Sequence, residues 1–417
     1  MAEPSARHLA VAALSEWRRK REFADAIIDR LLSRTKLAAR DRAFAVELFF
    51  GVLRNLTSLD FCIGCLRAGR LETGARDLLR TGLYQLLLLS IPEHAAIYET
   101  VNVASERQRA LVNGILRSAC RRRSELIEKI NSAPLDTRAS HPPFLIERWQ
   151  TSFGPQNTEL LCAWNNRPAP IYARINKLKT GRESFIREHP NAKPLAEVEN
   201  FVELKSLPMA ALNRGECYIQ DPSTAMPCVL LDPQPGEHML DACAAPGGKI
   251  GYLAELMQNR GLIAACDREE KRVRLLTENL NRLGVSIGTV ALHDWSTEPF
   301  PTSIAKDTPF DRILIDAPCT NTGVMRRRVD VRWRLGSDDF ARMQKRQVTI
   351  ARHVLPVLKP GGAFVYSTCS LESEENEGVV EGLLKMEPAL QLIETRQCLP
   401  FRDGFDGAFA AKIVKTA

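Results

Sequence analysis

Two cysteines in polar surroundings are the side chains of this sequence best suited to covalent chemistry. Cys319 lies in the segment DAPCTN and Cys369 in the segment YSTCS, and each follows a short apolar run that is typical of a buried strand. A thiolate is a strong nucleophile. A lone cysteine is more often a small buried side chain, but two polar-flanked cysteines at neighbouring strand ends favour a reactive pair.

Methylation of carbon 5 of cytosine is one reaction that uses such cysteines. Carbon 5 is a poor nucleophile, so a thiolate first adds to carbon 6 and turns the ring into an enamine. The reaction also needs an acid near ring nitrogen 3, a base for the carbon-5 proton, and a second group that assists release of the thiol. The sequence offers two cysteines in suitable places for this chemistry.

A pair of glycines marks a candidate cofactor site. Gly247 and Gly248 follow an expected strand and open a helix, where the backbone can approach a ligand and helix N–H groups are free. Asp267, Asp294 and Asp316 end the next three expected strands, and an acid at such a position can hold ribose hydroxyls. The dinucleotide fingerprint G-x-G-x-x-G is absent. The pattern therefore favours a nucleoside with an amino-acid tail, S-adenosylmethionine.

The elements that must position these residues alternate between strands and helices from about residue 226 onward. The expected strands are His238–Leu240, Leu262–Ala265, Gly288–Leu292, Arg312–Ile315 and Gly362–Tyr366. The expected helices are Ile250–Gln258, Glu269–Leu283, Asp338–Leu358 and Glu375–Met386. This alternation, with the candidate residues at strand C-termini, is typical of an α/β doubly wound (Rossmann-like) sheet.

The first third of the chain has a different texture. Apolar residues recur at spacings of three and four, as in Leu9, Ala13 and Trp17, which predicts an all-α helical bundle. Three prolines in the stretch 131–143 predict a linker. A helical piece near 144–164 and short strands then predict a small α/β subdomain; those strands are Ile171–Ile175, Phe201–Leu204 and Cys217–Ile219. The expected domains are 1–135, 136–225 and 226–417.

The distribution of charge and the number of cysteines restrict the possible functions further. Residues 1–150 carry 24 Lys and Arg against 17 Asp and Glu, whereas residues 151–417 carry 33 of each, so the net charge of +7 belongs to the first third. Such an excess fits a nucleic-acid-binding module or an arginine-rich solvated surface equally well.

The eleven scattered cysteines predict reduced thiols and no metal. No apolar run approaches the roughly 18 residues of a membrane helix, so we expect a cytoplasmic protein with no membrane partner.

Three segments together resemble a known family. DACAAPGGK, DAPCTNTGV and YSTCSLESEENE resemble the motifs of the Sun/Fmu (RsmB) family of RNA cytosine-5 methyltransferases. The segments ARDRAFAVELFFGVLR, LLRTGLYQLLLL, IPEHAAIYETV and RALVNGILR resemble the helical NusB-like RNA-binding domain of that family. The resemblance covers nearly the whole chain. It implies a class I methyltransferase domain that uses S-adenosylmethionine, with a cytosine of small-subunit (16S) ribosomal RNA as substrate.

The resemblance also implies roles for individual residues. Cys369 corresponds to the nucleophile, Cys319 to the cysteine that assists product release, and Asp316 to an acid between cofactor and base. Asp267 corresponds to the residue that holds the ribose, and Asp294 to one near the adenine. The remaining residues assigned to the cofactor are Cys243, Ala244, Ala245, Pro246, Gly247, Gly248, Lys249 and Arg272.

A basic segment follows the first cysteine motif. We expect its arginines to grip RNA phosphates beside an extruded base; they are Arg326, Arg327, Arg328 and Arg332. A solvated charged loop is the alternative. A cytosine must leave any stack to reach Cys369, which favours loop or junction RNA over a rigid duplex.

Three departures from the family pattern concern details of the pocket. Ile250 stands where Thr is usual, Asn321 replaces a glycine, and Ser373 replaces a common proline. Asn tolerates left-handed backbone better than most residues. None of the three removes a reacting group.

Four other functions compete with this interpretation. They are a non-catalytic RNA-binding or ribosome assembly factor, an oxidoreductase on the same fold, methylation of another RNA, and methylation of DNA. In DNA cytosine-5 enzymes the nucleophile lies on the Pro-Cys motif, which here would make it Cys319. The missing glycine fingerprint disfavours the oxidoreductase.

Overall fold

The computed structural model describes residues 4–20, 22–89, 91–299 and 309–416. The chain divides into two compact units. Unit 1 comprises Met1–Arg167 together with Met325–Leu335, and unit 2 comprises Pro168–Val324 and Gly336–Ala417. The first boundary therefore lies at Arg167, whereas the sequence predicted it at residue 135. A short segment from the C-terminal half also joins unit 1, which the sequence did not predict.

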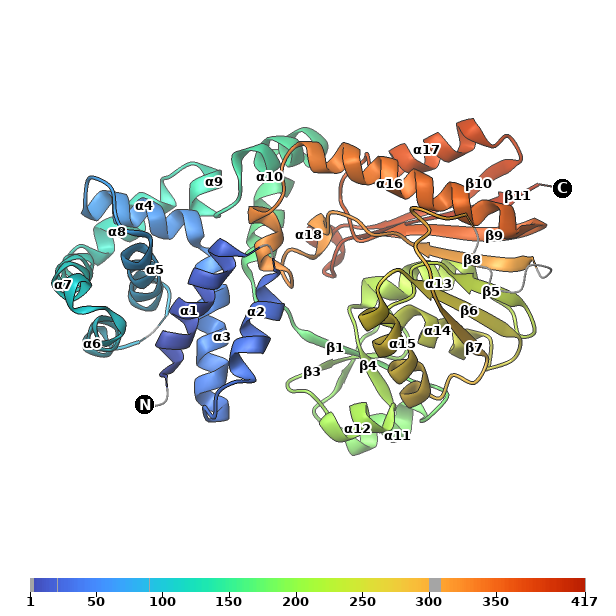
Figure 1. The fold of residues 1–417 in the computed structure, drawn as a ribbon, viewed down its shortest axis with the longest axis horizontal. Helices are drawn as coiled ribbons and strands as arrows, with labels where there is room; N and C mark the ends of the chain where they lie inside the picture. Colours follow the sequence, from blue (N-terminus) through green and yellow to red (C-terminus); the bar gives the residue numbers. More distant parts are fainter. Residues whose placement is uncertain (1–3, 21, 90, 300–308, 417) are drawn as a thin grey trace. The chain divides into compact units, whose positions relative to one another are not determined.

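Unit 1 is helical, as the apolar spacing predicted. Its core contains Leu48, Phe49, Leu79, Leu83 and Leu116, each with no exposed surface. The helices, labelled in Figure 1, are α1 (Ala6–Arg19), α2 (Ala24–Leu32), α3 (Ala39–Arg54), α4 (Leu56–Leu66), α5 (Thr73–Leu87), α6 (Glu93–Val103), α7 (Glu106–Arg121), α8 (Arg123–Asn131), α9 (Leu135–Arg138) and α10 (Pro143–Asn166). Helix α10 is kinked at Gly154, whose φ of 79° lies in the left-handed region that favours glycine.

The proline-containing stretch 131–143 is packed structure, so the prediction of a linker is wrong there. It contains α9, and Ser140 and His141 are buried. The Ser140 hydroxyl accepts a hydrogen bond from the Ser58 backbone N–H at 3.0 Å. The prolines that suggested a linker instead precede α9 and begin α10, because proline fits the start of a helix.

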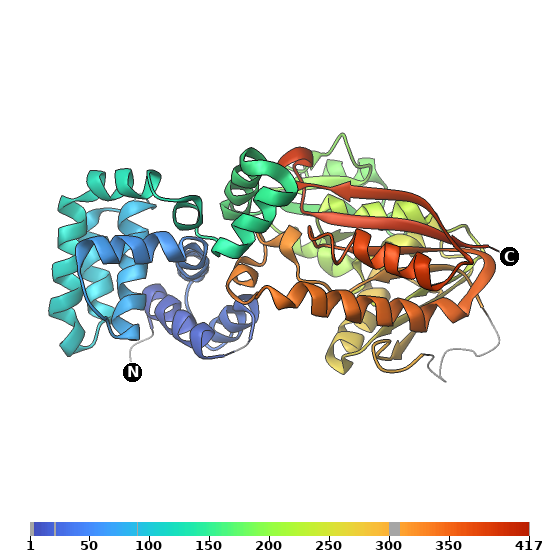
Figure 2. The same ribbon diagram turned by 90° about the horizontal axis from the view of Figure 1, so that it is seen from above.

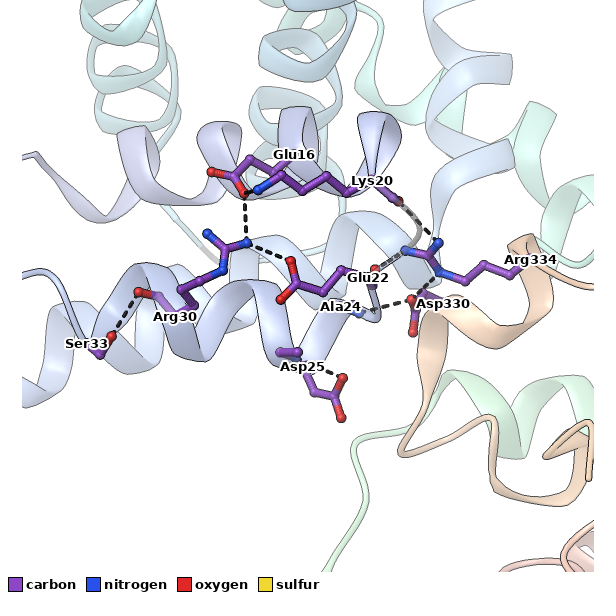
Figure 3. A network of polar contacts seen from close by, with 10 residues as sticks. Glu16, Lys20, Glu22, Ala24, Asp25, Arg30, Ser33, Asp330 and Arg334 are labelled. Atoms are coloured by element: carbon purple, nitrogen blue, oxygen red, sulfur yellow. Dashed lines mark hydrogen bonds and ion pairs between the residues drawn. The ribbon is translucent and has the colours of Figure 1, made fainter. Parts of the chain in front are cut away.

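The segment Met325–Leu335 is held in unit 1 by a polar network (Figure 3). Asp330 Oδ2 accepts hydrogen bonds from the Ala24 backbone N–H at 3.0 Å and from Arg334 Nε at 2.8 Å. The Arg334 guanidinium also donates to the backbone oxygen of Glu22. The Ala24 donor lies at the start of α2 and the Glu22 acceptor in the turn before it, so the segment is hydrogen-bonded to residues some 300 positions earlier in the chain.

Unit 2 begins with a small antiparallel sheet, which confirms the predicted α/β subdomain. The three predicted strands form with the predicted bounds: β1 (Ile171–Ile175), β3 (Phe201–Leu204) and β4 (Cys217–Ile219). A short strand, β2 (Lys193–Pro194), completes the order β2-β3-β1-β4. The helices beside it are α11 (Arg182–Glu188) and α12 (Met209–Arg214), and α13 (Met226–Leu231) leads on to the main sheet.

The main sheet of unit 2 has seven strands among the described residues, in the order β10-β11-β9-β8-β5-β6-β7 (Figure 1). Strands β9, β8, β5, β6 and β7 are parallel, and β11 and β10 continue the sheet in antiparallel fashion. The bounds are β5 (His238–Asp241), β6 (Leu262–Asp267), β7 (Gly288–Leu292), β8 (Phe310–Asp316), β9 (Leu358–Thr368), β10 (Leu390–Cys398) and β11 (Ala408–Lys415). The predicted doubly wound fold is confirmed.

Helices cover both faces of this sheet. The helices α14 (Gly248–Leu256) and α15 (Glu270–Leu283) pack on one face, and α16 (Asp338–Val354) and α17 (Glu377–Met386) run side by side along the other (Figure 2). Successive residues of a strand point to opposite faces. In β8, Ile313 accordingly joins the α16–α17 core while Leu314 joins the α14–α15 core. The strands are apolar on both sides for this reason, and their C-terminal ends carry the polar residues.

Candidate active site

The glycine pair lies where β5 passes into α14, as the sequence predicted. Gly247 has a φ of 108°, a left-handed conformation that favours glycine. A Cβ at Gly248 would lie 2.7 Å from the Tyr218 ring and 2.8 Å from the Gln220 amide oxygen. The first glycine thus permits the turn, and the second permits close approach of β4 and the residue after it.

A cavity of about 230 Å³ opens beside this turn. Seven of the residues predicted to bind a cofactor line it: Cys243, Ala244, Ala245, Pro246, Gly248, Lys249 and Asp316. Five lining residues were not predicted: Tyr218, Ile219, Gln220, Thr224 and Asp241. Four of these five come from β4 and the turn after it, so the small sheet of unit 2 supplies one wall. Sequence reasoning missed these four because no chemical motif marks them, whereas Asp241 begins the DACAAPGGK segment and was not assigned to the cofactor.

Asp241 is a buried acid in the wall of this cavity. Its Oδ2 has no hydrogen-bond partner, while its Oδ1 accepts from the Cys243 backbone N–H at 3.3 Å. Burial, together with the negative charge of Asp316, raises the pKa of Asp241 to about 7. A buried carboxylate oxygen without a partner is costly unless a ligand satisfies it. The cavity therefore fits a ligand that carries a donor or a positive charge.

Lys249 and Asp316 form an ion pair in the same cavity. Lys249 Nζ donates to Asp316 Oδ2 at 2.7 Å, and the Ser367 hydroxyl donates to Asp316 Oδ1 at 2.9 Å. Burial alone would lower the pKa of Lys249, but the charge and the hydrogen bond of Asp316 outweigh it and raise the pKa. Lys249 is thus a fixed cation, and Asp316 is held between the end of β9 and the first turn of α14.

The four remaining predicted cofactor residues do not line this cavity. Gly247 lies in the turn after β5, Arg272 lies in α15, and Asp267 and Asp294 lie at or just after the ends of β6 and β7. Asp267 at the end of β6 is 3.3 Å from Arg272 Nη1, and Arg272 Nη2 donates to the Ala245 backbone oxygen at 2.6 Å. Arg272 thereby connects β6 to the glycine turn. Asp294, two residues after β7, accepts hydrogen bonds from the Ser296 backbone N–H and hydroxyl.

The two cysteines are brought together at the C-terminal ends of β8 and β9. Their Sγ atoms lie 3.2 Å apart. Cys369 Sγ is also 3.3 Å from Asn321 Oδ1, and Asn321 Nδ2 donates to the Cys319 backbone oxygen at 2.8 Å. The φ of Asn321 is 62°, so the backbone is left-handed where the family usually has glycine. The hydrogen bond with Cys369 and burial raise the pKa of Cys319, which keeps Cys319 a thiol at neutral pH.

The structure contradicts the predicted phosphate contacts for two of the four arginines. Arg332 has no exposed surface and donates to the backbone oxygens of Ser140 and Asn165 at 3.2 and 3.1 Å. Arg326 is 3% exposed, and its guanidinium lies 3.8 Å from the centre of the Trp164 ring. Side chains buried in this way cannot present charge to a phosphate. Arg327 is partly exposed and Arg328 is exposed.

Comparisons with known proteins agree with this geometry. The ribosomal RNA small subunit methyltransferase B of Serratia proteamaculans is 38% identical over 91% of this chain and 92% of the relative. The protein of the same name from Salmonella arizonae is 36% identical with the same coverage. The chain belongs to the RsmB/F family of 16S rRNA methyltransferases. The resemblance seen in the motifs is thereby confirmed.

Three family profiles divide the RsmB/F chain in the order that the structure shows. Residues 4–121 match the NusB family, residues 141–200 the ferredoxin-like domain of RsmF/B-like methyltransferases, and residues 228–413 the 16S rRNA methyltransferase RsmB/F. The NusB match covers most of the helical bundle, and the RsmB/F match covers the doubly wound sheet. The ferredoxin-like match covers α10, β1 and β2 and ends just before β3.

Solved structures support the same fold. The crystal structure of PH0851 matches with a TM-score of 0.79 at 24% identity, covering 100% of this chain and 99% of that one. A methyltransferase homolog protein from Pyrococcus horikoshii matches with a TM-score of 0.59 at 30% identity, over 67% of this chain and 97% of that one. The structure of NSun6 from the same organism with SFG has a TM-score of 0.61 at 21% identity, over 66% and 98%.

The described residues of this family member contain no metal-ligating cluster and no single helix able to span a membrane. No group of three or more His, Cys, Asp or Glu side chains in the described ranges is arranged to hold a metal ion. Among the described helices, only α3 and α4 taken together, bent by 77°, have the length and apolar composition to cross a membrane.

Proposed function

We propose that this RsmB/F family member transfers a methyl group from S-adenosylmethionine to carbon 5 of a cytosine in small-subunit ribosomal RNA. The observation that carries the proposal is the pair of sulfur atoms 3.2 Å apart beside the cavity wall. Cys319 follows the cavity residue Asp316 by three residues, and Cys369 follows Ser367, whose hydroxyl donates to Asp316, by two. The names of the two bacterial relatives support small-subunit ribosomal RNA as the polymer.

The cavity suits the charges of this cofactor. S-adenosylmethionine supplies an electrophilic methyl group on a positively charged sulfur, and its amino-acid tail carries an ammonium and a carboxylate. The unpartnered oxygen of Asp241 can accept from the ammonium, and Lys249 and the free N–H groups at the start of α14 can hold a carboxylate. Asp267 and Asp294 lie at the next two strand ends, where we expect the ribose and the adenine.

We assign the nucleophile to Cys369. Its sulfur forms a bond to carbon 6 of the cytosine, and the electron pair of the ring double bond shifts toward carbon 4 and nitrogen 3. Asp316 binds the edge of the base near nitrogen 3, held in place by Lys249 and Ser367. Carbon 5, now an enamine carbon, would form a bond to the methyl carbon while the bond from that carbon to the sulfonium sulfur breaks, and S-adenosylhomocysteine leaves as a neutral thioether.

Release of the product reverses the addition. Loss of the carbon-5 proton to a base restores the double bond between carbons 5 and 6, and the bond from Cys369 sulfur to carbon 6 breaks. Cys319 remains a thiol because its pKa is raised, so it can donate its proton to the departing sulfur 3.2 Å away. Each cysteine thus has a separate role, and the roles are not interchangeable.

The substrate base has to be unstacked to reach this site. The two sulfurs lie at the end of β8 and β9, and a base inside a duplex cannot bring carbon 6 to a side chain there. We therefore expect a cytosine in a loop or junction. Arg328, which is exposed, and the partly exposed Arg327 remain our candidates for phosphate contacts beside it.

The decisive experiment is transfer of a labelled methyl group from S-adenosylmethionine to small-subunit ribosomal RNA that lacks the modification, followed by nucleoside analysis. Recovery of the label as 5-methylcytidine is the expected result. Label in another nucleoside, or in no RNA although the cofactor binds, would overturn the proposal. A protein that binds the RNA and no cofactor would instead be a non-catalytic assembly factor.

A further inference from the structure

Glu375 is a buried acid to which neither the sequence motifs nor the mechanism assigns a role. It lies in the turn before α17 and has no exposed surface. The ion pairs of the described residues do not include it, so its charge is balanced by neutral donors alone. Burying a carboxylate in this way costs free energy that hydrogen bonds must offset.

The carboxylate of Glu375 bonds to the residue that follows each reactive cysteine. Oε2 accepts from the Thr320 backbone N–H at 2.9 Å, and Oε1 accepts from the Thr320 hydroxyl. Oε1 also accepts from the Ser370 hydroxyl at 2.7 Å. Thr320 directly follows Cys319, and Ser370 directly follows Cys369. A single side chain therefore links two loops that are 50 residues apart in the chain.

Gln347 of α16 reinforces the link on the side of Cys319. Its Nε2 donates to Glu375 Oε2 at 2.9 Å and to the Pro318 backbone oxygen at 2.9 Å. The residues immediately before and after Cys319 are thus both tied to the Glu375–Gln347 pair. The bond to Ser370 is the only one of these contacts that reaches the loop of Cys369.

The loop of Cys369 has further ties that do not depend on Glu375. The Gly323 backbone N–H donates to the Cys369 backbone oxygen at 2.9 Å. The Leu371 backbone N–H donates to Thr322 Oγ1 at 2.9 Å. Asn376 Nδ2 donates to the Ser370 backbone oxygen at 3.0 Å. Two of these contacts join the loop of Cys369 to Thr322 and Gly323 in the loop of Cys319, so they hold both loops. Glu375 itself accepts two hydrogen bonds from Thr320, beside Cys319, and one from Ser370, beside Cys369, so loss of its carboxylate would loosen Cys319 more than Cys369.

We propose that Glu375 is the positioning residue that holds Cys319 at its short distance from Cys369 and so permits release of the methylated base. This inference rests on the proposed function. Glu375 contacts neither sulfur, and it acts through Thr320 and Ser370. Attack by Cys369 depends less on Glu375, whereas proton donation from Cys319 to the departing sulfur depends on it directly.

The test compares Glu375→Ala and Glu375→Gln with the wild-type full-length protein. The assay measures multiple-turnover methylation and, on denaturing gels, the fraction of protein joined covalently to RNA in the presence of S-adenosylmethionine. We expect Glu375→Ala to bind the cofactor normally, to retain RNA as a covalent adduct, and to turn over about tenfold more slowly, the factor that corresponds to one hydrogen bond to a charged group. Cys319→Ala provides the reference adduct.

Glu375→Gln should restore most of the turnover, because an amide can accept from the Thr320 N–H and from Gln347 and can donate to the two hydroxyls. If Glu375 only stabilised the fold, its substitution would reduce adduct formation and turnover together. Glu377→Ala is the matched control, since Glu377 is an exposed acid two residues away. It should behave like the wild type.

Thr320→Val keeps the test decisive if Glu375→Ala fails to fold. It removes one hydroxyl contact to Glu375 at nearly constant shape, and we expect a smaller accumulation of the same adduct. Turnover without adduct accumulation in the folded Glu375→Ala or Thr320→Val protein would overturn the inference. That result differs from failure of the proposed function, in which the wild type itself would form no 5-methylcytidine.

Discussion

The sulfur atoms of Cys319 and Cys369 lie 3.2 Å apart, although 50 residues of chain separate the two cysteines. The parallel pairing of β8 with β9 produces this distance, because Asp316 pairs with Ser367 and each cysteine follows the end of its strand by a few residues. The hydrogen bond with Cys369 and burial raise the pKa of Cys319, so Cys319 keeps its proton at neutral pH.

Substituting each cysteine separately should give opposite results. Cys369→Ala should abolish methyl transfer and form no adduct, because the sulfur that attacks carbon 6 is gone. Cys319→Ala should accumulate a covalent protein–RNA adduct, because release loses its proton donor. Denaturing gels with labelled RNA measure both, and Cys65→Ala, a partly buried thiol in unit 1, is the control. An adduct formed by the Cys369→Ala protein would make Cys319 the nucleophile.

Affinity for S-adenosylmethionine should increase with pH. The pKa of Asp241 is about 7, and a cationic ligand favours its ionised form. The ionised fraction rises about tenfold between pH 6 and pH 8, and the affinity measured by calorimetry should rise by about the same factor. Asp241→Asn should remove this dependence. Asp311→Asn is the control: hydrogen bonds to Lys359 and His238 lower the pKa of Asp311, so it stays ionised throughout.

Asp241 should also make the stability of the cofactor-free protein depend on pH. Stability should fall as the pH rises, whereas cofactor affinity should increase. The pKa of Asp241 is raised from 3.8 in the unfolded chain to about 7 in the folded one. The folded protein therefore binds the extra proton between these values, and its stabilising effect is lost as the pH rises through 7. Thermal unfolding of Asp241→Asn should show a smaller decline between pH 5 and pH 7.5. An equal decline in both proteins would contradict the assignment.

Adding one methyl group at Gly248 should weaken cofactor binding. The new Cβ would lie 2.7 Å from the Tyr218 ring and 2.8 Å from Gln220, so β4 and the glycine turn would have to move apart. We expect Gly248→Ala to bind S-adenosylmethionine at least about tenfold more weakly, which corresponds to about 1.4 kcal/mol. Gly181→Ala is the control, because nothing lies within 4 Å of its Cβ position. Unchanged affinity in Gly248→Ala would exclude this cavity as the cofactor site.

Removing Asp330 should destabilise unit 1. Its carboxylate is 2% exposed and accepts from the Ala24 N–H and from Arg334 (Figure 3). Asp330→Ala leaves the partly exposed Arg334 guanidinium and the buried Ala24 N–H without this acceptor, at a cost of about 2 kcal/mol in the free energy of unfolding. Lys129→Ala, which removes a solvent-exposed ion pair with Glu125, should destabilise the protein much less, because water already screens that pair. Hydrogen exchange in α2 would show whether the loss is local.

Arg328 and Arg332 should differ in their effect on RNA binding. Arg328→Ala removes an exposed charge and should lower the slope of log affinity against log salt by about 0.7 to 0.9. Arg332→Ala removes a buried side chain bonded to Ser140 and Asn165, so it should lower the unfolding temperature and leave the salt slope unchanged. If the slope of log affinity against log salt were the same in Arg328→Ala and the wild type, Arg328 would not be an RNA-contacting residue.

The sequence by itself determined the elements of local structure. The strands at Ile171–Ile175, Phe201–Leu204 and Gly288–Leu292 form with their predicted bounds, because runs of apolar residues bounded by turn residues fix extended backbone locally. Motif spacing likewise placed both cysteines and the strand-end acids at one edge of a parallel sheet. Strand β10 was not predicted, since six of its nine residues are exposed and it is the edge strand of the sheet, paired with β11.

Only the tertiary structure decided which side chains meet. Tyr218 and Gln220 form a wall of the cavity, and Arg332 is buried against Ser140, because elements far apart in sequence pack together. Sequence periodicity carries no information about such pairings. From sequence alone, an arginine is expected to be a solvated charge, because the acceptors that would allow its burial come from distant segments. Likewise, Glu375 would be predicted to be a surface acid, and only the packing of two loops around it shows that it is buried. The chemistry of the site was visible in residue types, and its geometry came from long-range packing.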